Sequence, residues 1–211
     1  MPHLIETDAD VAEGCAALAT LDPRFDQALA VIGPVPLRRR PAGFDALLRA
    51  ICSQQLSVAS ANAVWTRLEA AGATVPDTIQ SLGEDGLRAC GLSRQKAAYA
   101  LALARAGLDF EALAQMPEEE AVAALTAVKG IGLWTAEVYL MFALGRRDVF
   151  APGDLALQEA ARLLFDLPER PGEKALREMA LAWSPWRAVA ARILWAYYAH
   201  AKSREGIGAG T

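Results

Sequence analysis

The pattern of apolar and polar positions predicts an almost entirely helical chain. Apolar segments of helical length are separated by short turns rich in glycine, proline and capping residues, and no segment reads as a convincing strand. Alanine and leucine dominate while β-branched residues are sparse, which also favours helix. Helices are expected over residues 8–18, 23–31, 44–52, 58–71, 76–82, 84–89, 94–106, 117–129, 133–144, 154–165, 173–183 and 185–201.

Several helix starts carry their own capping chemistry. Asp8 or Asp10 is expected to cap the first helix, and Asp22 stands before a first-turn proline at the second. Ser57 and Ser93 precede two further apolar helical segments. These residues place the expected helix boundaries independently of the apolar pattern.

The composition is typical of a globular protein without a membrane-spanning segment. Of the 211 residues, 54% are hydrophobic, so the chain can bury a sizeable core. No apolar segment reaches the ~20 residues that span a bilayer, and the first ten residues do not resemble a signal peptide. Cys15, Cys52 and Cys90 are widely spaced and predict free thiols in a reducing cytoplasm rather than a metal site.

The net charge of -4 gives no general attraction for nucleic acid. However, arginines are grouped at Arg38–Arg40 and at Arg146–Arg147, while acids gather at Glu118–Glu120. A basic face on an acidic protein is therefore open, as is an ordinary solvated surface.

The most informative segment is a predicted helix that runs into Gly130-Ile131-Gly132 and is followed at once by a second helix. Two glycines allow a tight turn and a close approach of the backbone to a ligand. The amides around Gly132 would then point outward from a helix N-terminus, where they can bind an anion such as a DNA phosphate. A plain helix–helix turn is the alternative interpretation.

Pro152-Gly153-Asp154 follows an extended apolar segment and precedes another helix. Taken alone, Asp154 is explained as a helix N-cap. A capping carboxylate is also rigidly held, so this role is compatible with a chemical one.

The two segments together, residues 128–136 and 148–154, resemble the helix-hairpin-helix and Gly/Pro-Asp signature of base-excision DNA glycosylases (the HhH-GPD superfamily). Within it the chain is similar to the 3-methyladenine DNA glycosylase II family. Residues 51–57, 91–99 and 183–195 resemble further motifs of that family in the expected order. The resemblance covers about residues 21–201.

The resemblance implies an all-α fold with two helical lobes and an active-site cleft between them. One lobe would comprise residues 43–153 with the hairpin, and the other residues 1–42 and 154–211. Larger members of the family carry an N-terminal β-rich domain, for which too few residues precede Leu21, so the compact form is expected.

The function implied is hydrolytic excision of alkylated bases, such as 3-methyladenine and 7-methylguanine, after the nucleotide is flipped out of the duplex. Asp154 would be the catalytic carboxylate that stabilises an oxocarbenium-like sugar. An aromatic pocket would attract the cationic base, with Trp134 and Trp186 as first candidates and Tyr99 and Tyr139 behind them. For each tyrosine, a place in the core is the alternative.

Double-stranded DNA carrying a damaged base is the expected partner of a monomeric protein without membrane contact. Residues expected to contact the DNA are Gly130, Gly132, Lys129, Arg187 and the turn Gln54-Gln55-Leu56, from which Gln55 or Leu56 would enter the duplex as a wedge. An ordinary turn, with Gln54 bonded to a neighbour, is equally compatible. No cofactor is expected; a monovalent cation at the hairpin is an open alternative.

Bifunctional relatives place a Schiff-base lysine two residues after the second hairpin glycine, where this chain has Trp134. Lyase activity is therefore not expected. Three alternatives stay open: a mismatch or uracil glycosylase on the same scaffold, a non-catalytic DNA-binding module, and a helical protein-interaction domain.

Overall fold

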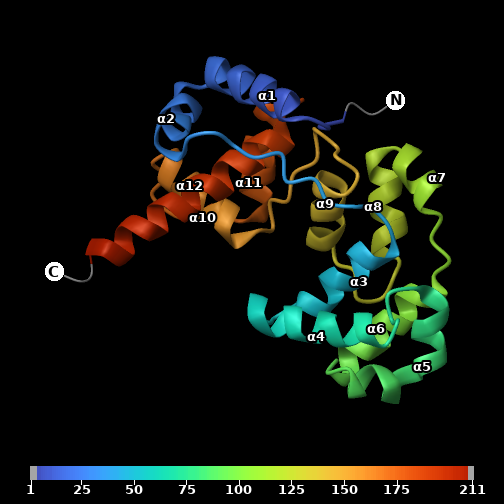
Figure 1. The fold of residues 1–211 in the computed structure, drawn as a ribbon. Coiled ribbons are helices and arrows are strands. Elements are labelled where there is room, and N and C mark those ends of the chain that lie inside the picture. Colours follow the sequence, from blue (N-terminus) through green and yellow to red (C-terminus); the bar gives the residue numbers. More distant parts are fainter. Residues whose placement is uncertain (1–3, 209–211) are drawn as a thin grey trace. The chain divides into compact units, whose positions relative to one another are not determined.

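The computed structural model describes residues 4–208, in which twelve α-helices and one 3-10 helix follow one another. β structure in this range is limited to an isolated antiparallel bridge between Leu4 and Arg146, so the all-helical prediction is confirmed. The helices, coloured along the chain in Figure 1, are α1 (Asp8–Leu21), α2 (Pro23–Ile32), α3 (Phe44–Ser53), α4 (Val58–Ala70), α5 (Pro76–Ala89), α6 (Arg94–Arg105), α7 (Phe110–Gln115), α8 (Glu118–Thr126), α9 (Leu133–Phe142), α10 (Leu155–Leu164), α11 (Glu173–Ala180), η1 (Leu181–Trp183) and α12 (Arg187–Gly208).

The chain forms two compact units. The internal unit is Arg40–Tyr139, and the terminal unit is the described part of Pro2–Arg39 together with Leu140–Thr211. The expected divisions, at residues 43 and 153, differ from these because the segment after Tyr139 is bound to the N-terminal segment. The Ile5 amide donates to the Gly145 carbonyl at 2.7 Å, beside the bridge to Arg146.

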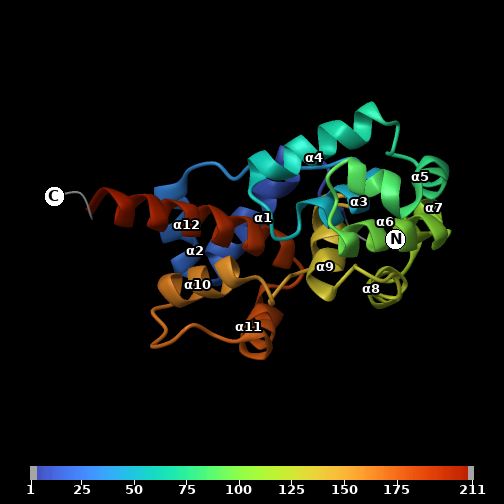
Figure 2. The same ribbon diagram turned by 90° about the horizontal axis from the view of Figure 1, so that it is seen from below.

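The terminal unit is built around α12, which packs against α1, α2 and α10 (Figure 2). Its core contains an aromatic cluster in which the ring centroids of Phe25, Phe150 and Phe165 lie 5.4–5.6 Å from that of Trp183. Edge-to-face and stacked ring pairs add to the burial of their apolar area. This cluster joins the two ends of the chain into one core.

In the internal unit, α3 packs against α4 and α6, and α5 packs against α6. The sequence predicts two short helices where α5 lies. The structure agrees, because α5 consists of two helical stretches that meet at a kink at Gly83, whose φ of 63° is non-helical. Glycine adopts this backbone conformation without the penalty of a Cβ atom.

Local signals located most helix starts. Asp22, Ser57 and Ser93 accept hydrogen bonds from first-turn amides as expected. The N-cap of α1 is Thr7, which the sequence analysis did not name. Asp10, one of the two expected caps, closes a capping box with Thr7. Helix α7 was not anticipated.

The three cysteines are free, with Cys52 and Cys90 buried and Cys15 half-buried, as the sequence indicates. Burial raises the pKa of both Cys15 and Cys52 to about 11, so these thiols stay protonated at neutral pH. None of the described helices is both long and apolar enough to cross a membrane.

Candidate active site

The helical hairpin in the internal unit has the expected form. Helix α8 ends at Thr126, a short turn follows, and α9 begins at Leu133. The turn is closed by hydrogen bonds from the Val128 amide to the Leu125 carbonyl at 3.1 Å and from the Ile131 amide to the Val128 carbonyl at 3.0 Å. Ile131 is only 4% exposed and anchors the turn in the core.

Gly130 fixes the shape of this turn. Its φ is 99°, and an added Cβ atom would lie 2.6 Å from Tyr99 Cβ. The Gly130 carbonyl accepts a hydrogen bond from Gln54 Nε2 at 3.0 Å. The hairpin is therefore held by Tyr99 from α6 and by Gln54 from the α3–α4 turn, and both side chains have structural roles here.

The outer side of the hairpin is exposed. Lys129 and Gly132 are exposed, and Trp134 on the first turn of α9 is 46% exposed. The Gly132 and Leu133 amides find no acceptor within residues 4–208, because a helix start offers its first amides no intrahelical carbonyl. Such amides, at the positive end of the helix dipole, are suited to bind a phosphate oxygen.

Asp154 is the N-cap of α10 in the terminal unit. Its Oδ1 accepts hydrogen bonds from the Ala156 amide at 2.9 Å and the Leu157 amide at 3.0 Å. The preceding turn is fixed as well, because Gln158 Nε2 donates to the Pro152 carbonyl at 2.9 Å. The capping interpretation is confirmed, and it leaves a half-buried carboxylate in a defined orientation.

Trp195 supplies a third donor that was not anticipated from the sequence. Its Nε1–H group donates to the same Asp154 Oδ1 at 3.2 Å, and its ring packs against Phe142 at a centroid distance of 5.6 Å. Arg192 in turn lies 4.6 Å from the Phe142 ring centroid. The tryptophan was visible in the C-terminal motif, but only the packing of α12 against α10 shows which group it contacts.

Two of the expected base-contacting aromatics are packed into the protein. Trp186 is 9% exposed, and Arg147 lies 4.7 Å from its ring centroid. Tyr139 is 6% exposed, and its hydroxyl accepts a hydrogen bond from the Gly43 amide at 3.0 Å. Burial raises the pKa of Tyr139. These rings have clear packing roles, which leaves Trp134 as the well exposed member of the predicted set.

Arg187 pairs with Asp148. Its Nε and Nη2 atoms contact the two carboxylate oxygens at 2.8 and 3.0 Å, and Ser184 Oγ adds a third donor at 2.8 Å. Bidentate pairing of this kind fixes the arginine geometrically. The interaction ties the start of α12 to the segment that leads to Asp154.

The turn between α3 and α4 presents two of its three expected residues to solvent. Gln55 is exposed and has a φ of 55°, and Leu56 is 42% exposed. Gln54, by contrast, bonds to the hairpin. The structure thus separates a structural residue from two that are accessible to a ligand.

Comparison with known proteins shows which family this chain is related to. Residues 48–187 match the HhH-GPD superfamily of base excision DNA repair proteins. The DNA-3-methyladenine glycosylase 1 of Schizosaccharomyces pombe is 30% identical over 190 residues, which cover 84% of this chain and 83% of that protein.

Two solved structures are similar throughout. A DNA-3-methyladenine glycosidase from Bacillus halodurans is 34% identical with a TM-score of 0.79, covering 89% of each chain. The S. pombe 3-methyladenine DNA glycosylase in complex with abasic DNA is 29% identical with a TM-score of 0.75, covering 87% of this chain and 95% of that one.

The two hairpin glycines should differ in their effect on stability. Gly130→Ala should lower the free energy of unfolding by roughly 1–2 kcal/mol for the positive φ and by roughly 1–3 kcal/mol more for the contact with Tyr99. Gly132→Ala meets nothing within 4 Å and should change it by less than about 0.5 kcal/mol. Urea denaturation measures both; equal losses would show that the Tyr99 contact does not set the turn.

Proposed function

This chain belongs to the HhH-GPD superfamily of base excision DNA repair proteins, and we propose that it is a monofunctional DNA glycosylase that removes alkylated bases from double-stranded DNA. The names of the related glycosylases support 3-methyladenine as a substrate. The observation that carries the proposal for this chain is the fixed carboxylate of Asp154 at the start of α10.

Asp154 would act on the sugar. When the C–N bond breaks, its electron pair leaves with the base and the sugar becomes an oxocarbenium-like cation. The carboxylate stabilises that developing positive charge, and water then bonds to the anomeric carbon and releases its proton to the solvent. Trp195 and two backbone amides hold Asp154, so little reorganisation is needed during the reaction.

The preference for alkylated bases follows from the charge of the leaving group. A purine methylated at N3 or N7 is cationic within the nucleotide, so its departure as a neutral base needs no general acid. This fits a chain whose two histidines, the residues most often used as general acids, are His3 and His200 near its ends. Trp134 is our candidate for stacking on such a base, with a cation–π attraction of ~0.5–2 kcal/mol.

DNA would be held mainly through its backbone. The Gly132 and Leu133 amides are placed to bind one phosphate, with Lys129 exposed beside them. Gln55 or Leu56 would enter the base stack in place of the flipped nucleotide. Contacts through amides and an apolar wedge also explain how an acidic chain could bind a polyanion.

The proposal also covers the cofactor, the oligomeric state and the cellular location. The hydrolysis proposed here requires no cofactor, and a monovalent cation at the hairpin stays an alternative. A monomer acting in the cytoplasm is the simplest state consistent with free thiols.

Base release measures the substrate class directly. Duplexes that contain 7-methylguanine, 3-methyladenine, hypoxanthine or uracil are incubated with excess protein, and the freed base is quantified. We expect the two methylated bases to be released fastest, because their glycosidic bonds are already weakened by charge. Faster release of hypoxanthine or uracil would favour a mismatch-type glycosylase, and binding without release of any base would favour a DNA-binding module.

The product should be an intact abasic site. Trp134 occupies the position of the Schiff-base lysine, so borohydride should trap no protein–DNA adduct. Two lysines of the internal unit serve as controls: Lys129, which is exposed, and Lys96, whose Nζ donates to the Cys52 carbonyl at 2.7 Å and whose pKa is lowered by burial.

A trapped adduct that Lys129→Ala or Lys96→Arg abolishes would overturn the monofunctional assignment and identify the amine. Absence of the adduct in the unmodified protein, together with accumulation of alkali-sensitive sites, is the expected result.

A further inference from the structure

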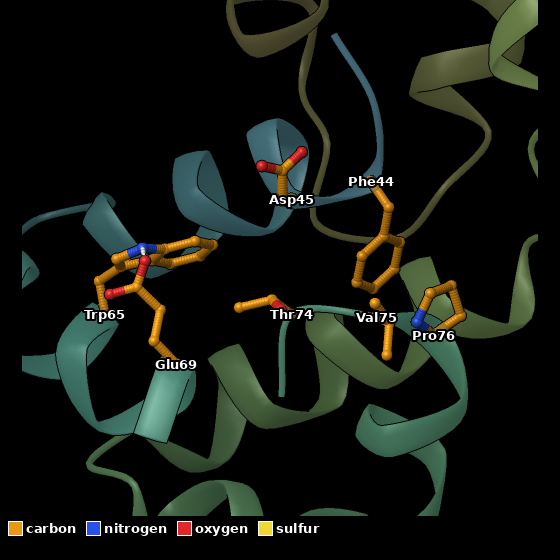
Figure 3. A pocket seen from close by; sticks show the side chains of 7 residues that line it. All are labelled: Phe44, Asp45, Trp65, Glu69, Thr74, Val75 and Pro76. Atoms are coloured by element: carbon orange, nitrogen blue, oxygen red, sulfur yellow. Dashed lines mark hydrogen bonds between the residues drawn. The ribbon is translucent and has the colours of Figure 1, made fainter. Parts of the chain in front are cut away.

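The internal unit contains a cavity of about 490 Å³ that the proposed reaction does not use. It lies where α3, α4 and the segment before α5 meet. Figure 3 shows the Phe44 and Trp65 rings on either side of it, and Asp45 and Glu69 are also among the residues that line it. None of these residues belongs to the hairpin, to the α3–α4 turn or to the terminal unit.

Neither carboxylate in this cavity forms an ion pair within residues 4–208. The Asp45 side chain is exposed, and its carboxylate makes no hydrogen bond in that range. Glu69 Oε1 accepts a hydrogen bond from Trp65 Nε1 at 2.6 Å. The cavity therefore combines two aromatic rings with negative charge that no bridging cation neutralises.

The Trp65 ring already attracts one cation of this chain. The Arg49 guanidinium lies 4.9 Å from its centroid, and Arg49 is not part of the cavity lining. Aromatic faces attract cations through their quadrupole, and the attraction grows when carboxylates lie nearby. The two carboxylates disfavour a phosphate group as the occupant, because like charges repel.

We propose that this cavity binds an arginine side chain of a partner protein. A guanidinium is planar, so it can stack on an aromatic ring while it donates hydrogen bonds to a carboxylate. The exposed Val75 at the rim, 50% accessible, offers apolar contact for the methylene groups of the same side chain. The inference does not depend on the proposed glycosylase activity.

The test uses the full chain labelled with ¹⁵N and the peptide Ac-Gly-Arg-Gly-NH₂. Binding should shift the Trp65 indole N–H resonance and the backbone amides of residues 74–75 in a saturable manner. The matched citrulline peptide has the same shape without charge and should bind at least about tenfold more weakly, because it loses both the cation–π and the charge-assisted contacts. Raised salt should weaken only the arginine peptide.

Two variants test whether the arginine peptide binds in the cavity. The double variant Asp45→Asn, Glu69→Gln keeps the side-chain shapes and should lose at least about tenfold in affinity, whereas Asp77→Asn, at the equivalent first-turn position of α5, should change nothing. Equal binding of the two peptides, an unchanged affinity of the double variant, or shifts that Asp77→Asn removes as effectively would overturn the proposal. In those cases Asp45 only complements the dipole of α3.

Discussion

The proposed chemistry depends on the hydrogen bonds that converge on one oxygen of Asp154. Two amides of α10 and the Trp195 indole all donate to Oδ1. Each bond is ordinary, but together they use the exposed amides of a helix start to orient a carboxylate. The same interaction that begins the helix therefore positions the charge that the proposed chemistry needs, so one side chain would serve both the helix and the reaction.

In the proposed function the hairpin would bind DNA mainly through its backbone. It offers two backbone amides with a single lysine beside them, and it is held by Gly130, Tyr99 and Gln54 inside the internal unit. A chain with a net charge of -4 would thus need no extended basic surface to bind a phosphate at this turn. Because the site is made of backbone, its geometry is sensitive to the turn and insensitive to most surface substitutions.

Much of this could be predicted from local signals, and the site contacts that could not be predicted share one cause. Caps at Asp22 and Ser57, the hairpin glycines and the cap role of Asp154 follow from interactions within a few residues. Contacts between distant segments did not follow, such as Trp195 with Asp154 or Trp186 packed into its unit's core. The helical period of the sequence predicts that an aromatic residue lies on an apolar face. It does not predict which distant group packs against that residue.

The most direct test separates the charge of Asp154 from its cap. Asn is as good an N-cap as Asp, so Asp154→Asn should leave the free energy of unfolding within about 0.5 kcal/mol and keep DNA affinity. Single-turnover release of 7-methylguanine should fall by about 10²–10³-fold, since the variant cannot stabilise the sugar cation. Asp154→Ala, which loses both roles, should also unfold more easily. A variant Asp154→Asn that is stable and retains most of its rate would contradict the account.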